Sequence, residues 1–81
     1  MHMAYGSVRR KTAQSLLYFA EAFNKKPKEN MHILRTDLAS VAGIATETLI
    51  RTLTGFKKAG YIEVDKQHIR IIDQAKLQLM T

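Results

Sequence analysis

The chain has 81 residues, of which 46% are hydrophobic and 25% are charged, and it contains no cysteine. This length supports one domain, and the composition is that of an ordinary globular protein. The lack of cysteine excludes a disulfide scaffold and thiolate zinc sites. No apolar run approaches the roughly 18 residues of a membrane span, and nothing at the N-terminus reads as a signal peptide. We therefore expect a cytoplasmic protein.

The formal net charge is +6, with a pI near 9.9. On so small a domain this excess of positive charge favours an anionic partner. Nucleic acid and an anionic membrane surface both satisfy that requirement, so the pattern along the chain has to decide between them.

Residues 1–3, Met-His-Met, look like an initiator followed by a cloning remnant, which leaves 4–81 as the domain. Ser7 is the expected N-cap of a first helix that runs to about Asn24. Basic residues 9–11 are better explained as a solvated face than as phosphate contacts. The apolar stripe of this helix is expected to contain Val8, Thr12, Leu16, Phe19, Ala20 and Phe23.

The next segment predicts a loop, a short strand and a second helix. Lys25 to Asn30 reads as a surface loop, and Met31 to Leu34 as a short strand. Thr36 is the expected N-cap of the second helix, and Gly43 should end it because a left-handed C-cap costs glycine least. The residues expected to point inward are Leu38, Val41 and Ala42.

A third helix is expected over about 46–59, with Gly60 at its end. Its buried stripe should consist of Leu49, Leu53 and Phe56. Alternating residues at 61–64 and 68–71 predict a two-stranded hairpin around Asp65-Lys66-Gln67. Asp73 is the expected cap of a last short helix that carries Leu77 and Met80.

Two short helices joined by a turn with glycine, then a hairpin, follow the order of a winged helix-turn-helix. The predicted fold is mainly α with a small β-hairpin: a three-helix core plus a wing at 61–72. A DNA major groove about 12 Å wide admits one helix, braced by a second. The sequence therefore predicts a double-stranded DNA-binding domain whose recognition helix is the third one.

Burial of the stripe on the third helix leaves an opposite face, which carries Glu47, Ile50, Arg51 and Thr54. Arg51 can donate two hydrogen bonds to guanine, and Glu47 can accept one from cytosine N4. An ordinary surface salt bridge between these two residues is the alternative. Ile50 either packs against the wing or meets a thymine methyl group, and packing is the simpler interpretation.

Basic residues of the hairpin are candidates for phosphate contacts. They are Lys66, His68 and Arg70. Each contacted phosphate should contribute about −0.9 to the slope of log K against log salt.

The segment 36–51, TDLASVAGIATETLIR, resembles the helix-turn-helix of the cyclic-AMP receptor protein and fumarate-nitrate regulator family, which are bacterial transcription factors. The likeness extends back through 13–17, AQSLL, and forward through 56–62, FKKAGYI, and covers roughly 8–73. Its most specific part is 47–51, ETLIR, which is similar to the family's glutamate–threonine–apolar–variable–arginine signature.

The resemblance implies that Glu47 and Arg51 read a guanine–cytosine pair and that Ile50 is the variable base-facing position. It also implies phosphate contacts from Arg35, Thr46 and Thr48. The sequence departs from the family at Ala45, where a capping serine or threonine is usual. The lost cap should cost about 1 kcal/mol unless Thr46 takes over that role.

Family members carry an effector-binding β-barrel domain and a long dimerisation helix before this module. The resemblance therefore implies an excised C-terminal domain. The effector, for which a cyclic nucleotide is one candidate, would bind the missing domain, and this chain needs no cofactor of its own. The parent protein should be a homodimer and this fragment a monomer or weak dimer. By resemblance, the loop at 25–30 corresponds to a surface that some members use to touch RNA polymerase; a solvated loop is the simpler interpretation.

An enzyme is not expected. The three histidines, at 2, 32 and 68, are scattered, and no metal-ligand spacing, catalytic arrangement or phosphate-binding glycine loop appears. His32 is expected to be a half-buried strand residue rather than a ligand. The main alternative to DNA binding is a protein-interaction or oligomerisation module, because this fold serves both uses. A repressor of another winged-helix family, dimerising through its terminal helices, is a further alternative.

Overall fold

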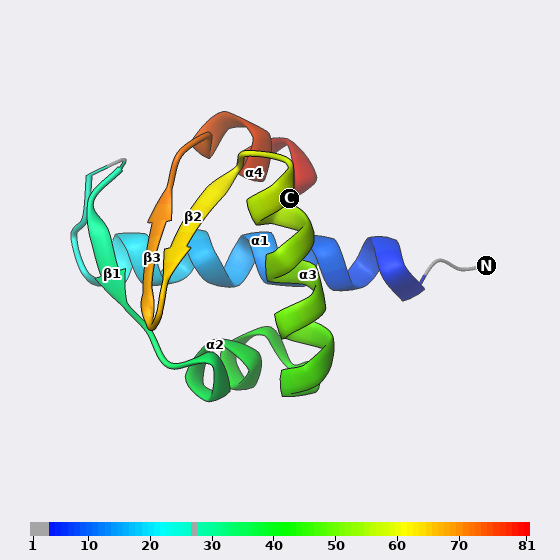
Figure 1. The fold of residues 1–81 in the computed structure, drawn as a ribbon. Coiled ribbons are helices and arrows are strands. Elements are labelled where there is room, and N and C mark those ends of the chain that lie inside the picture. Colours follow the sequence, from blue (N-terminus) through cyan, green and yellow to red (C-terminus); the bar gives the residue numbers. More distant parts are fainter. Residues whose placement is uncertain (1–3, 27) are drawn as a thin grey trace.

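The computed structural model describes residues 4–26 and 28–81. Residues 1–3, which we predicted to be a cloning remnant, and Pro27 in the predicted loop lie outside the described residues. The described part forms α1 (Ala4–Ala22), β1 (Asn30–His32), α2 (Arg35–Ala42), α3 (Thr46–Lys58), β2 (Ile62–Asp65), β3 (His68–Ile71) and α4 (Gln74–Met80) (Figure 1). The predicted winged helix-turn-helix is confirmed, with β1 as a third strand beside the hairpin.

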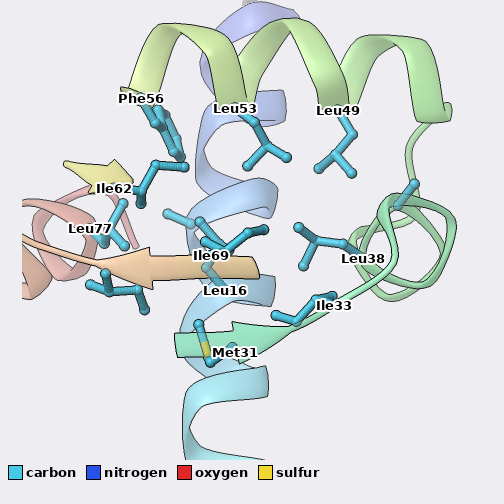
Figure 2. Close-up of a cluster of buried hydrophobic side chains, with 13 residues drawn as sticks. Leu16, Met31, Ile33, Leu38, Leu49, Leu53, Phe56, Ile62, Ile69 and Leu77 are labelled. Atoms are coloured by element: carbon cyan, nitrogen blue, oxygen red, sulfur yellow. The ribbon is translucent and has the colours of Figure 1, made fainter. Parts of the chain in front are cut away.

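The hydrophobic core lies between the three-stranded antiparallel sheet and the helices. The strand order is β1-β3-β2, and α1 crosses behind the sheet and α3 (Figure 1). Leu49, Leu53 and Phe56 point from one side of α3 into this core, as expected for positions three and four residues apart (Figure 2). They meet Ile69 of β3 and Leu38 of α2, so the same side chains fix α3 against both its brace and the sheet.

The sheet register assigns each strand residue to one of two faces. Ile69 pairs with Met31 on one side and with Val64 on the other. Because side chains alternate along a strand, the neighbours of Ile69 on β3, His68 and Arg70, lie on the outer face. The wing therefore presents its polar residues to solvent.

The turn between α2 and α3 has the predicted glycine geometry. Gly43 has φ 73°, in the left-handed region, and its N–H donates to Ala39 O at 2.8 Å. Our prediction that Val41 points inward was wrong, because its side chain is 48% exposed. Ala39 is buried instead, beside Leu38 and one turn before Ala42. The buried stripe of this short helix is thus displaced from the predicted one.

Two predicted helix caps were wrong. The first helix begins at Ala4, so Ser7 lies inside it with a helical backbone rather than that of an N-cap. The second begins at Arg35, which places Thr36 within its first turn. The preceding Leu34 is extended and caps without a side-chain hydrogen bond. The cap at Asp73 was predicted correctly, since its Oδ1 accepts from Lys76 N at 3.1 Å.

The inner face of α1 is smaller than the predicted stripe. Thr12 and Leu16 are fully buried, whereas Phe23 is 43% exposed near the end of the helix. His32 is exposed, so the expected half-buried histidine was wrong: it points to the outer face of β1. None of the described helices combines the length and the hydrophobicity needed to cross a membrane.

Candidate nucleic-acid interface

The outer face of α3 carries the residues that were predicted to read bases. Glu47, Ile50, Arg51 and Thr54 are all exposed. The predicted exposure of this face is confirmed, and Leu49, Leu53 and Phe56 point from α3 into the core (Figure 2). A helix that is anchored along one side and polar along the other can enter a groove without losing its packing.

Glu47 and Arg51 do not form the surface salt bridge that was the alternative to base contact. Within the described part of the chain, neither side chain has an ion-pair or hydrogen-bond partner. Thr54 differs, because its Oγ1 donates to Ile50 O at 3.0 Å, within the helix. The carboxylate and the guanidinium therefore remain available to an external ligand.

A shallow hollow of about 100 Å³ lies between α3, the start of α2 and β2. Ile50 forms part of its wall together with Val64 of the wing and Arg35 of α2. Ile50 nevertheless stays 42% exposed. Packing toward the wing thus covers only part of the side chain, and the rest faces the same solvent as Glu47 and Arg51.

Lys57 lines the same hollow, one turn beyond Thr54. Lys57 was not among the predicted site residues. The signal was present, because Lys57 continues the series 47, 50, 54 at helical spacing. It places a positive charge where α3 meets the wing.

The first turn of α3 has no side-chain cap. Ala45 occupies the N-cap position with an extended backbone, φ −66° and ψ 145°, and no side chain accepts from the free N–H groups. Thr46 and Thr48 are half-buried within the first turn, and Thr46 does not take over as cap. Glu47 is the acidic residue of this turn. Its negative charge is stabilising there because it lies at the positive end of the helix dipole.

We expect Ala45→Thr to be about 1 kcal/mol more stable than Ala45→Val, because the threonine oxygen can accept from an N–H of the first turn. The two side chains have the same shape, so the comparison isolates the hydroxyl group. Urea denaturation followed by circular dichroism measures the difference. Equal stability of the two variants would show that solvent already satisfies this helix end.

The wing carries its basic residues in unequal environments. Lys66 lies at the tip of the turn with φ 57° and is exposed. His68 is exposed and lies beside His32, with 5.2 Å between the ring centroids. Arg70 donates to the Glu63 carboxylate directly across the strand pair. With Glu63 and Asp65 against Lys66 and Arg70, the formal charges of the wing at 61–72 sum to zero, so its basic residues do not make it a positive surface.

The basic run at 9–11 begins in the second turn of α1 because the helix starts early. The Arg9 Cζ atom lies 5.3 Å from the centroid of the Phe56 ring, a distance at which a cation stacks favourably on an aromatic face. Arg10 and Lys11 are exposed. At least Arg9 thus contributes to packing rather than to a purely solvated face.

Solved structures similar to this chain include a catabolite activator protein and transcriptional regulators. The Thermus thermophilus catabolite activator protein is similar with a TM-score of 0.84 and 21% identity, over 95% of this chain and 35% of its own. A putative crp/fnr-family transcriptional regulator from Eubacterium rectale has a TM-score of 0.79 and 21% identity, over 89% and 32%. A second Thermus thermophilus structure, a transcriptional regulator of the CRP/FNR family, has a TM-score of 0.76 and 19% identity, over 89% and 39%.

The chain therefore spans about a third of the length of these structures. The comparison with curated proteins found no match. A sequence model described as the Crp-like helix-turn-helix domain matches residues 10–80, which is most of the chain and includes α2, α3 and the wing. The chain belongs to the family of Crp-like helix-turn-helix domains.

Proposed function

We propose that this domain binds double-stranded DNA in a sequence-specific manner as the DNA-binding part of a bacterial transcription regulator. In this proposal α3 lies in the major groove and the β2–β3 hairpin lies against the phosphate backbone. Family membership supports the DNA-binding class, and the outer face of α3 supports the specific mode.

The observation that carries the proposal is that Glu47 and Arg51 lie on the same exposed face of α3. They lie one helical turn apart, both exposed, and neither is neutralised by a partner in the described part of the chain. A guanidinium can donate two parallel hydrogen bonds to guanine O6 and N7, and a carboxylate can accept from cytosine N4. Together they are suited to neighbouring bases of a site that contains guanine–cytosine pairs.

Ile50 would meet bases between these two side chains. Its exposed part can contact a thymine methyl group, while its covered part keeps the side chain against the wing through the hollow that Val64 lines. We therefore expect preference for thymine at one position rather than a strict requirement.

Phosphate contacts in the proposed complex come from both sides of α3. They are assigned to Arg35, Thr46, Thr48, Lys57, Lys66, His68 and Arg70. Arg70 should contribute least, because Glu63 already neutralises its guanidinium. Such contacts set position and affinity but carry no sequence information.

Selection of preferred duplexes from a random pool tests the proposal. Two copies of the domain joined by a flexible linker would be used, so that two half-sites can be occupied together. The expected product is a palindrome with a guanine–cytosine pair at a fixed position in each half-site. Weak binding with no enriched sequence at any salt concentration would instead support an interaction module.

Lys66→Asn is expected to reduce the magnitude of the slope of log K against log salt by about 0.9, the value for one released counterion. Asparagine tolerates the left-handed backbone at this position, so the turn should be kept. The control is Lys76→Gln on α4, which lies at the other end of the domain from the wing tip (Figure 1). Equal slopes for the two variants would place the wing off the backbone.

A further inference from the structure

Two of the three histidines of the chain meet on the outer face of the sheet. His32 of β1 and His68 of β3 are directly opposite in the antiparallel register. Ile33 N donates to Gln67 O at 2.9 Å, so the next pair along the ladder, 32 with 68, is a non-hydrogen-bonded one. In such pairs the Cα atoms are about 4.5 Å apart and the side chains come closest. The backbone therefore holds these two imidazoles together.

The separation of the two rings matches that of two imidazoles on a shared metal ion. The two centroids are 5.2 Å apart. With Zn–N bonds of about 2.05 Å and a tetrahedral angle of about 109°, two imidazoles on one zinc ion have their centroids about 5.2 Å apart. The rings are thus already at the separation that a bound ion would impose.

Gln67 supplies a third oxygen or nitrogen ligand beside the pair. Its Oε1 accepts a hydrogen bond from His32 Nε2 at 3.1 Å. In the proposed complex the metal ion would take the place of this proton, since two ligand atoms of one tetrahedral zinc ion are about 3.3 Å apart. Within the described residues no three His, Cys, Asp or Glu side chains converge on one point. The amide oxygen and solvent would therefore complete the coordination.

The surrounding charge does not oppose a cation at this position. Asp65 lies opposite His68 in the register of the hairpin. It therefore contributes a negative charge on the same face of the sheet. Lys66 is adjacent in sequence, but it lies at the exposed tip of the turn. Arg70, the next outward residue on β3, is neutralised by Glu63.

We infer that His32 and His68 bind one divalent transition-metal ion of the zinc type, with the Gln67 amide oxygen at a third position. Imidazole nitrogen is a preferred ligand of zinc, nickel and copper ions, whereas magnesium and calcium prefer oxygen. An exposed site of this composition should bind reversibly and keep positions open for water. The inference does not depend on DNA binding.

Isothermal titration of the 81-residue protein with zinc chloride, in a buffer that does not bind metals, tests this site. One ion per chain is expected. His32→Gln and His68→Gln should each weaken binding by at least about tenfold, since losing a ligand should cost no less than losing an outer-shell partner. The matched control is His2→Gln, which removes the remaining histidine and should leave the affinity unchanged.

Two further readouts separate a ligand role from a structural one. Both histidines are exposed, so the thermal unfolding of either variant without zinc should match the parent. In NMR spectra, the imidazole signals of residues 32 and 68 should shift together at one equivalent of zinc. Absence of binding, equal binding by all variants, or loss of binding only in His2→Gln would overturn the inference. Because no DNA is used, none of these outcomes bears on the proposed function.

Discussion

Arg51→Ala is expected to lower the affinity of the linked domain for its selected duplex by about 1–3 kcal/mol per site and to relax the base preference at one position. The reason is geometric: the guanidinium is exposed, unpaired within the described part of the chain and held on a helix whose other side is fixed in the core. Fluorescence anisotropy with the selected duplex, and with duplexes changed at single base pairs, measures both effects.

The matched control for this prediction is Arg51→Lys. Lysine keeps the positive charge but lacks the planar fork that donates two parallel hydrogen bonds. The salt dependence should therefore stay close to that of the parent, while discrimination at the guanine position falls. If Arg51→Lys kept full discrimination, Arg51 would act as a simple charge and another residue would read the base.

Glu47 supplies a second test of the same geometry. If the two side chains read neighbouring bases independently, the effects of Glu47→Ala and Arg51→Ala on binding should be additive. If each instead orients the other in the complex, a double-mutant cycle will show coupling. In the free domain the two groups form no salt bridge, which favours additivity.

The recognition helix could be predicted closely because its signals agree with one another. Leu49, Leu53 and Phe56 repeat at helical spacing, and Gly43 and Gly60 flank the helix with left-handed backbones. When periodicity and turn residues indicate the same boundaries, little freedom is left to tertiary packing. The face that carries Glu47 and Arg51 followed directly from that assignment.

The second helix shows where such reasoning fails. It has 8 residues, little more than two turns, so several rotations about its axis satisfy the sequence pattern almost equally. Contact with α1 and α3 decided the rotation, burying Ala39 and leaving Val41 at the surface. Its expected cap failed for a related reason: the hydrogen bond from Ile33 N to Gln67 O keeps the preceding segment extended until just before Arg35.

Relationships across the sheet were also beyond the sequence. The ion pair of Arg70 with Glu63 and the facing of His32 with His68 depend on the register of three strands. Spacing along the chain gives no sign of either one. The basic residues of the wing could therefore be predicted from the sequence, but not which of them is neutralised, and the two facing histidines looked scattered along the chain.

The largest effect on stability is expected for Phe56→Ala, at about 3–5 kcal/mol. Phe56 is completely buried, its ring lies 5.8 Å from that of Tyr61, and its backbone O accepts from Tyr61 N at 3.0 Å. At about 0.05–0.15 kcal/mol per residue, a domain of this size has only about 4–12 kcal/mol in total. Urea denaturation should show a strongly destabilised or unfolded variant.

Ile50→Ala is the control on the same helix, and it should change stability far less because a large part of its side chain is exposed. Its effect should appear in DNA binding instead.

Phe56→Leu keeps the site apolar and should fold, yet it removes the ring beneath Arg9 and beside Tyr61. This ring joins α3 to the start of the wing. We therefore expect Phe56→Leu to weaken DNA binding, although residue 56 is buried and does not itself contact DNA. Unchanged affinity in that variant would mean that the backbone hydrogen bond from Tyr61 alone fixes the angle between helix and wing.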